Sequence, residues 1–128
     1  MDHQYTFGGL STDYMLEVDY DAHNGGWKSP IIRANEPFQL DPANATLHDS
    51  IECFEGLKAY ITHDNRVMLF RPDKNFERMN NSHRQLGFPE YSPKEMIECL
   101  KELVKIEKEW IPRRPLHSLY IRDRKSVV

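Results

Sequence analysis

The strongest folding signal in this sequence is a pair of capped amphipathic helices in its second half. Ser92-Pro93-Lys94-Glu95 is typical of a helix start, because serine caps free N–H groups, proline suits the first helical position and glutamate completes a capping box. An apolar stripe follows at helical spacing, made of Met96, Ile97, Leu100, Leu103 and Val104. The pattern predicts a helix through Lys108 that closes at Trp110 and Ile111, before Pro112.

The other helix comes just before it. Pro72 opens this helix, Asp73 lies in its first turn, and Gly87 follows its expected last residue, Leu86. One side carries Phe76, Met79, His83 and Leu86, and the other carries Arg71, Asn75, Arg78 and Ser82. Each helix therefore has one side to bury against the rest of the chain.

Two β-rich regions precede the helices. Residues 12–20 alternate in character, which predicts a half-buried strand with one buried side made of Tyr14, Leu16, Val18 and Tyr20. Residues 57–61 and 66–70 flank the polar turn 63–65, and this pattern predicts a β-hairpin.

Three further segments complete the expected fold. Residues 46–56 favour a short helix, with Thr46 as its N-cap and Gly56 at its end. Residues 118–122 read as a last strand, and residues 123–128 show no pattern that would give them a partner. Strands, a hairpin and two amphipathic helices together predict an α+β domain with helices over a sheet.

Composition excludes several classes of function. The formal charge is -3 and no basic block stands out, so neither nucleic acid nor anionic membrane is an expected partner. The apolar stretches are too short to span a bilayer, and the start lacks the features of a signal or transit peptide. Cys53 and Cys99 lie far apart, which favours a reduced compartment. We therefore expect a cytoplasmic protein, with a mitochondrial location left open.

Pattern alone names no reaction. The six histidines have no carboxylate or cysteine at metal-ligand spacing, and no glycine-rich phosphate loop is present. On pattern alone, Arg71 and Arg78 are more simply a solvated helix face than a binding site. Tyr120 is equally well explained by strand packing, and residues 54–56 by a helix terminus.

Several segments in order resemble the branched-chain amino-acid aminotransferases, which are pyridoxal-phosphate enzymes of fold type IV. The segments that carry the resemblance are residues 12–15 (TDYM), 26–27 (GW), 40–43 (LDPA), 47–48 (LH), 52–60 (ECFEGLKAY), 69–75 (LFRPDKN), 78–79 (RM) and 118–122 (SLYIR). Each segment is short, but their shared order and spacing make the resemblance specific. The eukaryotic branch of the family is the nearest likeness.

The resemblance implies a fold and a set of site residues. Residues 1–122 would form the small N-terminal domain of a fold type IV enzyme, with helices packed on an antiparallel-rich sheet. Arg78 would bind the phosphate of the pyridoxal 5'-phosphate cofactor. The substrate pocket would take Phe54 and Gly56 for the branched side chain, and Tyr120 and Arg122 for carboxylates. The implied reaction is amino transfer between leucine, isoleucine or valine and 2-oxoglutarate, in a dimer.

Two departures from the family pattern lower what we expect of the chain. The family usually has tyrosine where this sequence has Asp49, which would place a carboxylate beside an apolar pocket. After Arg122 the family continues with proline and a second domain, whereas residues 123–128 form a divergent tail. That domain carries the Schiff-base lysine and the acidic partner of the pyridine nitrogen. We expect neither stable cofactor binding nor transamination from this chain alone.

Two other interpretations remain open. The chain would be a non-catalytic fragment that pairs with a full-length subunit, in which case it should co-purify with that subunit. Alternatively it would be an inert product of a gene model or of splicing, and no peptide from residues 123–128 should then be found in the source cells.

Overall fold

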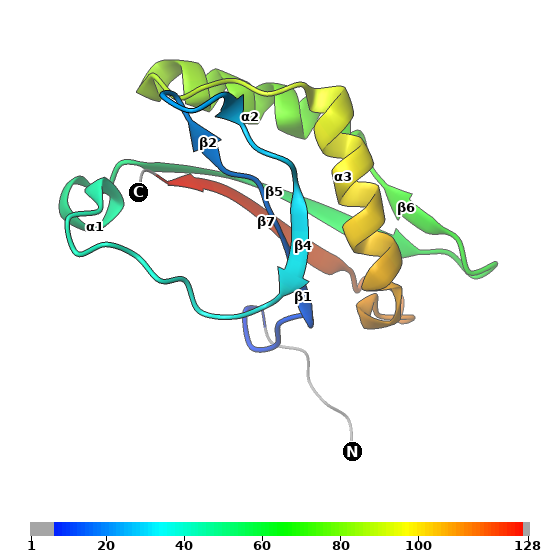
Figure 1. The fold of residues 1–128 in the computed structure, drawn as a ribbon. Helices are drawn as coiled ribbons and strands as arrows, with labels where there is room; N and C mark the ends of the chain where they lie inside the picture. Colours follow the sequence, from blue (N-terminus) through cyan, green and yellow to red (C-terminus); the bar gives the residue numbers. More distant parts are fainter. Residues whose placement is uncertain (1–6, 127–128) are drawn as a thin grey trace.

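The computed structural model describes residues 7–126 and has an α+β fold of three helices and short antiparallel sheets (Figure 1). Its elements, in chain order, are β1 (Tyr14–Glu17), β2 (Tyr20–Asp21), β3 (Gly26–Trp27), β4 (Ile31–Ala34), α1 (Ala45–Asp49), β5 (Glu52–Ile61), β6 (Val67–Leu69), α2 (Pro72–Leu86), α3 (Pro93–Ile106), the 3-10 turn η1 (Lys108–Trp110) and β7 (Leu119–Ser126). None of the helices described here is long and apolar enough to cross a membrane.

Strand β5 is the centre of the main sheet. It pairs antiparallel with β6 on one edge and with β7 on the other. The β5–β7 pairing runs from Glu52 opposite Ser126 to Ala59 opposite Leu119. Successive side chains of a strand point to opposite faces, and here the buried positions are Cys53, Glu55, Leu57 and Ala59. The expected hairpin is therefore confirmed, and its first strand is longer than predicted.

Helices α2 and α3 cover the buried face of this sheet (Figure 1). The shared core consists of Leu57, Ala59, Phe76, Leu100, Val104 and Ile111. Helix α2 has the predicted bounds and ends where Gly87 takes a left-handed conformation (φ 71°). Helix α3 begins as predicted, with the Ser92 hydroxyl accepting a hydrogen bond from the backbone N–H of Glu95 (3.4 Å). It ends at Ile106, before the predicted closure at Trp110 and Ile111, and η1 follows.

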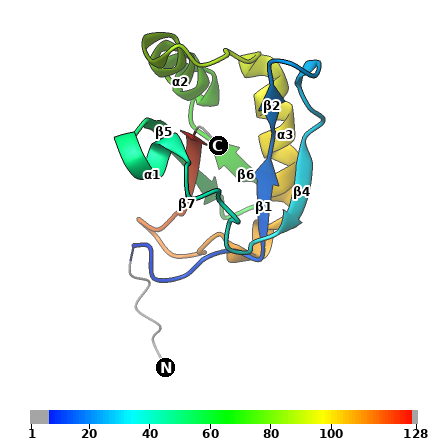
Figure 2. The same ribbon diagram turned by 60° about the vertical axis from the view of Figure 1, so that its left-hand side comes forward.

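The N-terminal segment forms two small ladders, β1–β4 and β2–β3, beside α3 (Figure 2). The side chain of Glu107 is buried and accepts a hydrogen bond from the backbone N–H of Tyr14, which fixes β1 against the end of α3. The predicted single strand over residues 12–20 was wrong in two respects. It is divided between β1 and β2, and Tyr14 and Tyr20, expected on its buried side, are exposed.

The predicted helix over residues 46–56 was also wrong in its bounds. Helix α1 is capped by Asn44, whose side-chain oxygen accepts from the N–H of Thr46 (2.8 Å), so Thr46 is not the cap. The helix ends where Ser50 adopts a left-handed conformation (φ 55°). Residues 52–56 belong instead to β5, because they pair with a strand some seventy residues later in the chain. Local pattern contains no information about that partner.

Strand β7 continues beyond the predicted residue 122. Asp123 and Lys125 lie opposite Glu55 and Cys53, so residues 123–126 do have a pairing partner. Asp123 accepts a hydrogen bond from the hydroxyl of Tyr91 (3.1 Å). Burial raises the pKa of the Asp123 carboxyl and lowers the pKa of the Lys125 ammonium. The end of β7 therefore brings two charged groups into a site that disfavours charge.

We expect Asp123→Asn to stabilise the chain at neutral pH. Because the folded state raises the pKa of Asp123, folding binds a proton between the ordinary carboxyl pKa and the raised value. Stability should therefore fall as the pH rises through that window, and the variant should not show this fall. Urea unfolding at pH 4, 5.5 and 7 measures the difference. A variant whose advantage does not grow with pH would contradict this account.

Candidate functional site on the sheet face opposite α2 and α3

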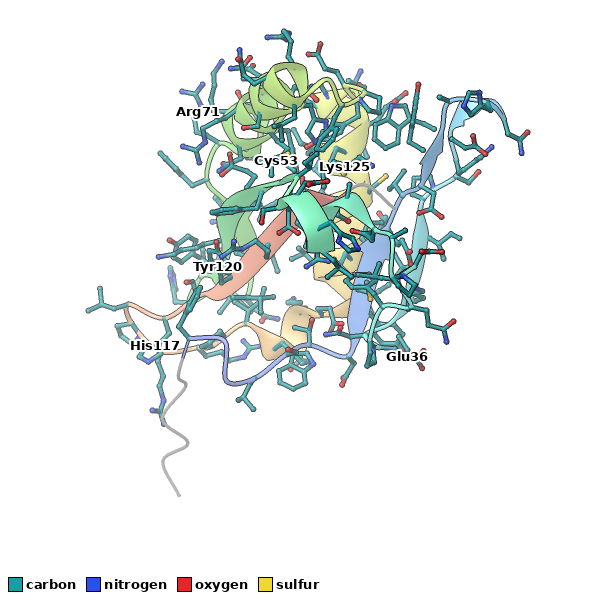
Figure 3. The ribbon with its side chains drawn as sticks, turned by 90° about the vertical axis from the view of Figure 1, so that its left-hand side faces the viewer. Glu36, Cys53, Arg71, His117, Tyr120 and Lys125 are labelled. Carbon is teal, nitrogen blue, oxygen red and sulfur yellow. The ribbon has the colours of Figure 1, made fainter. Side chains whose placement is uncertain are left out.

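Four of the predicted site residues lie together on the face of the sheet opposite α2 and α3. Phe54 and Gly56 are on β5, and Arg122 lies directly across from Gly56 on β7. Tyr120 is two residues before Arg122 and therefore on the same face, toward the start of β7 (Figure 3). Residues from two strands that are far apart in sequence thus form one contiguous surface.

Arg122 links the aromatic side chains of this surface. Its guanidinium carbon lies 4.2 Å from the ring centroid of Phe54 and 5.3 Å from that of Tyr120. A guanidinium stacked over aromatic rings is held in place while its N–H edges stay available to a carboxylate. Phe54 is 59% exposed, so it offers an apolar wall beside the positive charge. The combination suits a ligand with an apolar part and a carboxylate.

Gly56 allows Tyr120 to lie across the strand. A Cβ atom built at Gly56 would be 2.2 Å from the hydroxyl oxygen of Tyr120 and 2.9 Å from its Cζ. Any side chain at this position would therefore push the tyrosine ring aside. The absence of a side chain at Gly56 sets the position of the ring.

Arg78 is on α2 and does not belong to this surface. Its guanidinium reaches the strand and donates to Glu55, with Nε 2.6 Å from Oε2 and Nη2 2.5 Å from Oε1. Burial would raise the pKa of Glu55, but hydrogen bonds from Arg78, the Gly56 N–H and Asn75 outweigh it and lower the pKa below its usual range. The pair is therefore ionised at neutral pH.

A small hollow of about 150 Å³ lies beside Arg78. Its lining residues are Phe70, Arg71, Lys74, Asn75 and Arg78. Three of them are cationic, and Arg71 stands at the start of α2 on the outside of the domain (Figure 3). Arg71 and Lys74 also form ion pairs with Asp73 (3.5 Å) and Glu77 (2.6 Å), both exposed. A phosphate dianion fits both the size of this hollow and its charge.

Asn75 and Glu55 join the two parts of the site. The side-chain nitrogen of Asn75 donates to the carbonyl of Gly56 (3.1 Å) and to Oε1 of Glu55 (3.2 Å). The backbone N–H of Gly56 also donates to Oε1 of Glu55 (2.8 Å). Arg78 and the backbone of Gly56 are therefore held by one buried carboxylate.

Sequence reasoning did not select Glu55 or Asn75. The signal for Glu55 was its place in the alternation of Cys53, Leu57 and Ala59, at positions that face the core. The prediction that residues 54–56 end a helix concealed this signal. Asn75 had been placed on the polar side of α2 with Arg78, but its contact across to the sheet depends on the tertiary structure.

Asp49 is exposed at the end of α1. A larger hollow of about 530 Å³ is lined by Leu10 and residues 109–114, and it contains none of the predicted site residues. In the part of the chain that the structure describes, no three His, Cys, Asp or Glu side chains are grouped so as to hold a metal ion.

We expect Gly56→Ala to destabilise the chain by about 1–3 kcal/mol, because the new methyl group overlaps the Tyr120 ring. The cost should largely disappear in a Tyr120→Ala background, where the space is vacant. A double-mutant cycle followed by urea unfolding measures this coupling. Equal costs in the two backgrounds would show that the contact with Tyr120 is not the cause.

Curated proteins similar to this chain share one description. A branched-chain-amino-acid aminotransferase 2 of Bacillus subtilis is 45% identical over 119 residues, which cover 93% of this chain and 32% of that protein. A probable branched-chain-amino-acid aminotransferase of Staphylococcus epidermidis is 49% identical over 116 residues, which cover 91% of this chain and 32% of that protein. The cytosolic branched-chain-amino-acid aminotransferase of sheep (Ovis aries) is 41% identical over 116 residues, which cover 91% of this chain and 30% of that protein.

Both of these bacterial proteins are more similar to the chain than the sheep enzyme is, so they give no support to the expected nearness to the eukaryotic branch. No protein-family model matches the sequence. The chain spans about a third of the length of the curated relatives it matches. Over that third, the chain is similar in sequence to the branched-chain-amino-acid aminotransferases, and this coverage is consistent with an N-terminal portion.

Proposed function

We propose that this chain is the small domain of a fold type IV branched-chain aminotransferase. It would supply Arg78, the arginine that binds the cofactor phosphate, and one wall of the substrate pocket. The observation that carries the proposal is spatial. Phe54, Gly56 and Arg122 share one face of the sheet, and the network around Glu55 joins that face to Arg78. Residues selected by resemblance alone thus fall into two adjacent groups with suitable chemistry.

The hollow beside Arg78 would hold the phosphate of pyridoxal 5'-phosphate. A guanidinium offers several N–H donors in a plane, which suits phosphate oxygens, and Arg71 and Lys74 add positive charge around the same space. When bound, the cofactor supplies an electron sink for the reacting amino acid. The chain's own contribution here is to bind the phosphate and fix its position.

The face of the sheet opposite α2 and α3 would hold the substrates. Phe54 would contact the branched side chain of leucine, isoleucine or valine, and Gly56 would contribute by leaving room for the Tyr120 ring that lies over it. Arg122 would bind a carboxylate, including the distal carboxylate of glutamate or 2-oxoglutarate, and Tyr120 would assist through its hydroxyl. The stacking of Arg122 on Phe54 places the apolar and carboxylate-binding groups next to each other.

We further propose that amino transfer needs a cofactor-bearing lysine from outside these 128 residues. Lys125 lies across from Cys53, near the end of β7, and its half-buried side chain is on the face away from Gly56 and Tyr120 (Figure 3). Lys58 is exposed on the same face as Gly56, but its place in the segment 52–60 matches a different family position. Neither lysine has the setting that the family's cofactor lysine requires.

Arg78→Ala should abolish the phosphate response of the chain. Inorganic phosphate is titrated into the folded protein and followed by NMR shifts of Asn75 and of the first turn of α2, which border the hollow. The matched control is Arg84→Ala, the same change on the same helix, in an arginine that pairs with Glu90 (2.5 Å). Equal responses in the two variants would remove the phosphate role of Arg78.

The purified 128-residue chain should not convert leucine and 2-oxoglutarate to products. Because it offers no cofactor lysine, treatment with pyridoxal 5'-phosphate and then borohydride should leave no stoichiometric pyridoxyl adduct on a single lysine. Mass spectrometry of the digested protein tests this directly. An adduct at one site together with turnover would overturn the proposal that catalysis needs residues outside the chain.

A further inference from the structure

We propose that Glu55 is a positioning residue, which holds the guanidinium of Arg78 in one orientation with its free edge toward the phosphate hollow. This inference rests on the phosphate role proposed for Arg78. It adds a second residue, from the sheet, to a site otherwise built on α2. Two geometric observations support it: the burial of the acceptor and the way the guanidinium is bound.

The burial of Glu55 sets this pair apart from the other arginine pairs of α2. The Glu55 side chain is 4% exposed, whereas the Arg78 side chain is 69% exposed. The acceptors of Arg71 and Arg84, which are Asp73 and Glu90, are 46% and 44% exposed. An exposed pair restricts an arginine little, because both partners remain mobile. A buried, immobile carboxylate gives the arginine a fixed anchor.

Two hydrogen-bond donors other than Arg78 hold that anchor in place. Oε1 of Glu55 accepts from the backbone N–H of Gly56 and from Asn75, as well as from Arg78. The backbone of Gly56 is fixed in turn by its pairing with β7. The carboxylate therefore fixes the side chain of Arg78, which is on α2, relative to the sheet.

The guanidinium is bound through only part of its donor set. The bonds to Glu55 use Nε and Nη2, and a guanidinium has five N–H groups in one plane. The two N–H groups of Nη1 remain outside this pair. With Nε and Nη2 fixed, the plane of the guanidinium is fixed, and so is the direction of Nη1. An anion would then meet donors that are already oriented.

A simple counter-charge would have the opposite effect. If Glu55 only neutralised Arg78, its negative charge would repel phosphate and its removal would strengthen binding. If Glu55 orients Arg78, any change that weakens the two hydrogen bonds between them should weaken phosphate binding, even when the change removes negative charge. The two accounts therefore predict opposite signs for the same substitution.

The test compares Glu55→Asp and Glu55→Gln with Glu90→Asp as a matched control, because Glu90 is the exposed acceptor of Arg84 and does not line the hollow. Aspartate keeps the charge but is one methylene too short to span to Arg78, and glutamine keeps the length but loses the charge. NMR of the folded 128-residue chain follows the Arg78 Nε–H signal and its shift with inorganic phosphate. We expect the wild type and Glu90→Asp to show a slowly exchanging Nε–H of Arg78 and the same phosphate affinity.

Both Glu55 variants should lose the slowly exchanging signal and bind phosphate on the order of tenfold more weakly, because the donors are no longer aligned. Stronger binding by Glu55→Gln, or an unchanged affinity in Glu55→Asp, would overturn the positioning role and leave the phosphate role of Arg78 standing. If the wild-type Arg78 signal does not respond to phosphate, the proposed function itself is overturned, and this inference with it. If Glu55→Asp does not fold, the sign of the Glu55→Gln effect still decides between the two accounts.

Discussion

The structure depends on the antiparallel pairing of β5 with β7, because this pairing gives β5 two faces with different tasks. One face carries Leu57 and Ala59 into the core beneath α2 and α3. The other carries Phe54 and Gly56 to the side opposite these helices, next to side chains from β7. A strand alternates sides at every residue, so core and site are interleaved along a single segment. Neither can shift in register without moving the other.

Glu55 departs from this pattern on β5, because its carboxylate occupies a position that faces the core. Burying a charged group is costly unless hydrogen bonds replace the lost water. Here the replacements come from Arg78, the Gly56 backbone and Asn75. The Glu55 carboxylate is thus compensated by groups that belong to the candidate site, whereas Glu107, which is also buried, accepts a hydrogen bond from the backbone N–H of Tyr14. At the end of β7, Asp123 and Lys125 are half-buried with fewer compensating contacts.

Features encoded locally were predictable from the sequence. The cap at Ser92, the stop at Gly87 and the hairpin around residues 63–65 involve neighbours in the chain, and all three were found. Residues 52–56 and 123–126 were assigned wrongly for one shared reason: each is a strand only because the other is its partner. The site divides in the same way. Resemblance selected Arg78 and the four residues on the sheet, whereas the role of Glu55 required the three-dimensional contact.

The close approach of Tyr120 to Gly56 has a consequence for how such a site can vary. The two positions share one volume, so a larger residue on β5 requires a smaller one on β7. Changes at either position alone would be opposed by steric overlap or by an empty space. Related chains that accept bulkier or smaller side chains should therefore differ at these positions in pairs. The space available between Gly56 and Tyr120 is therefore set jointly by one residue from β5 and one from β7.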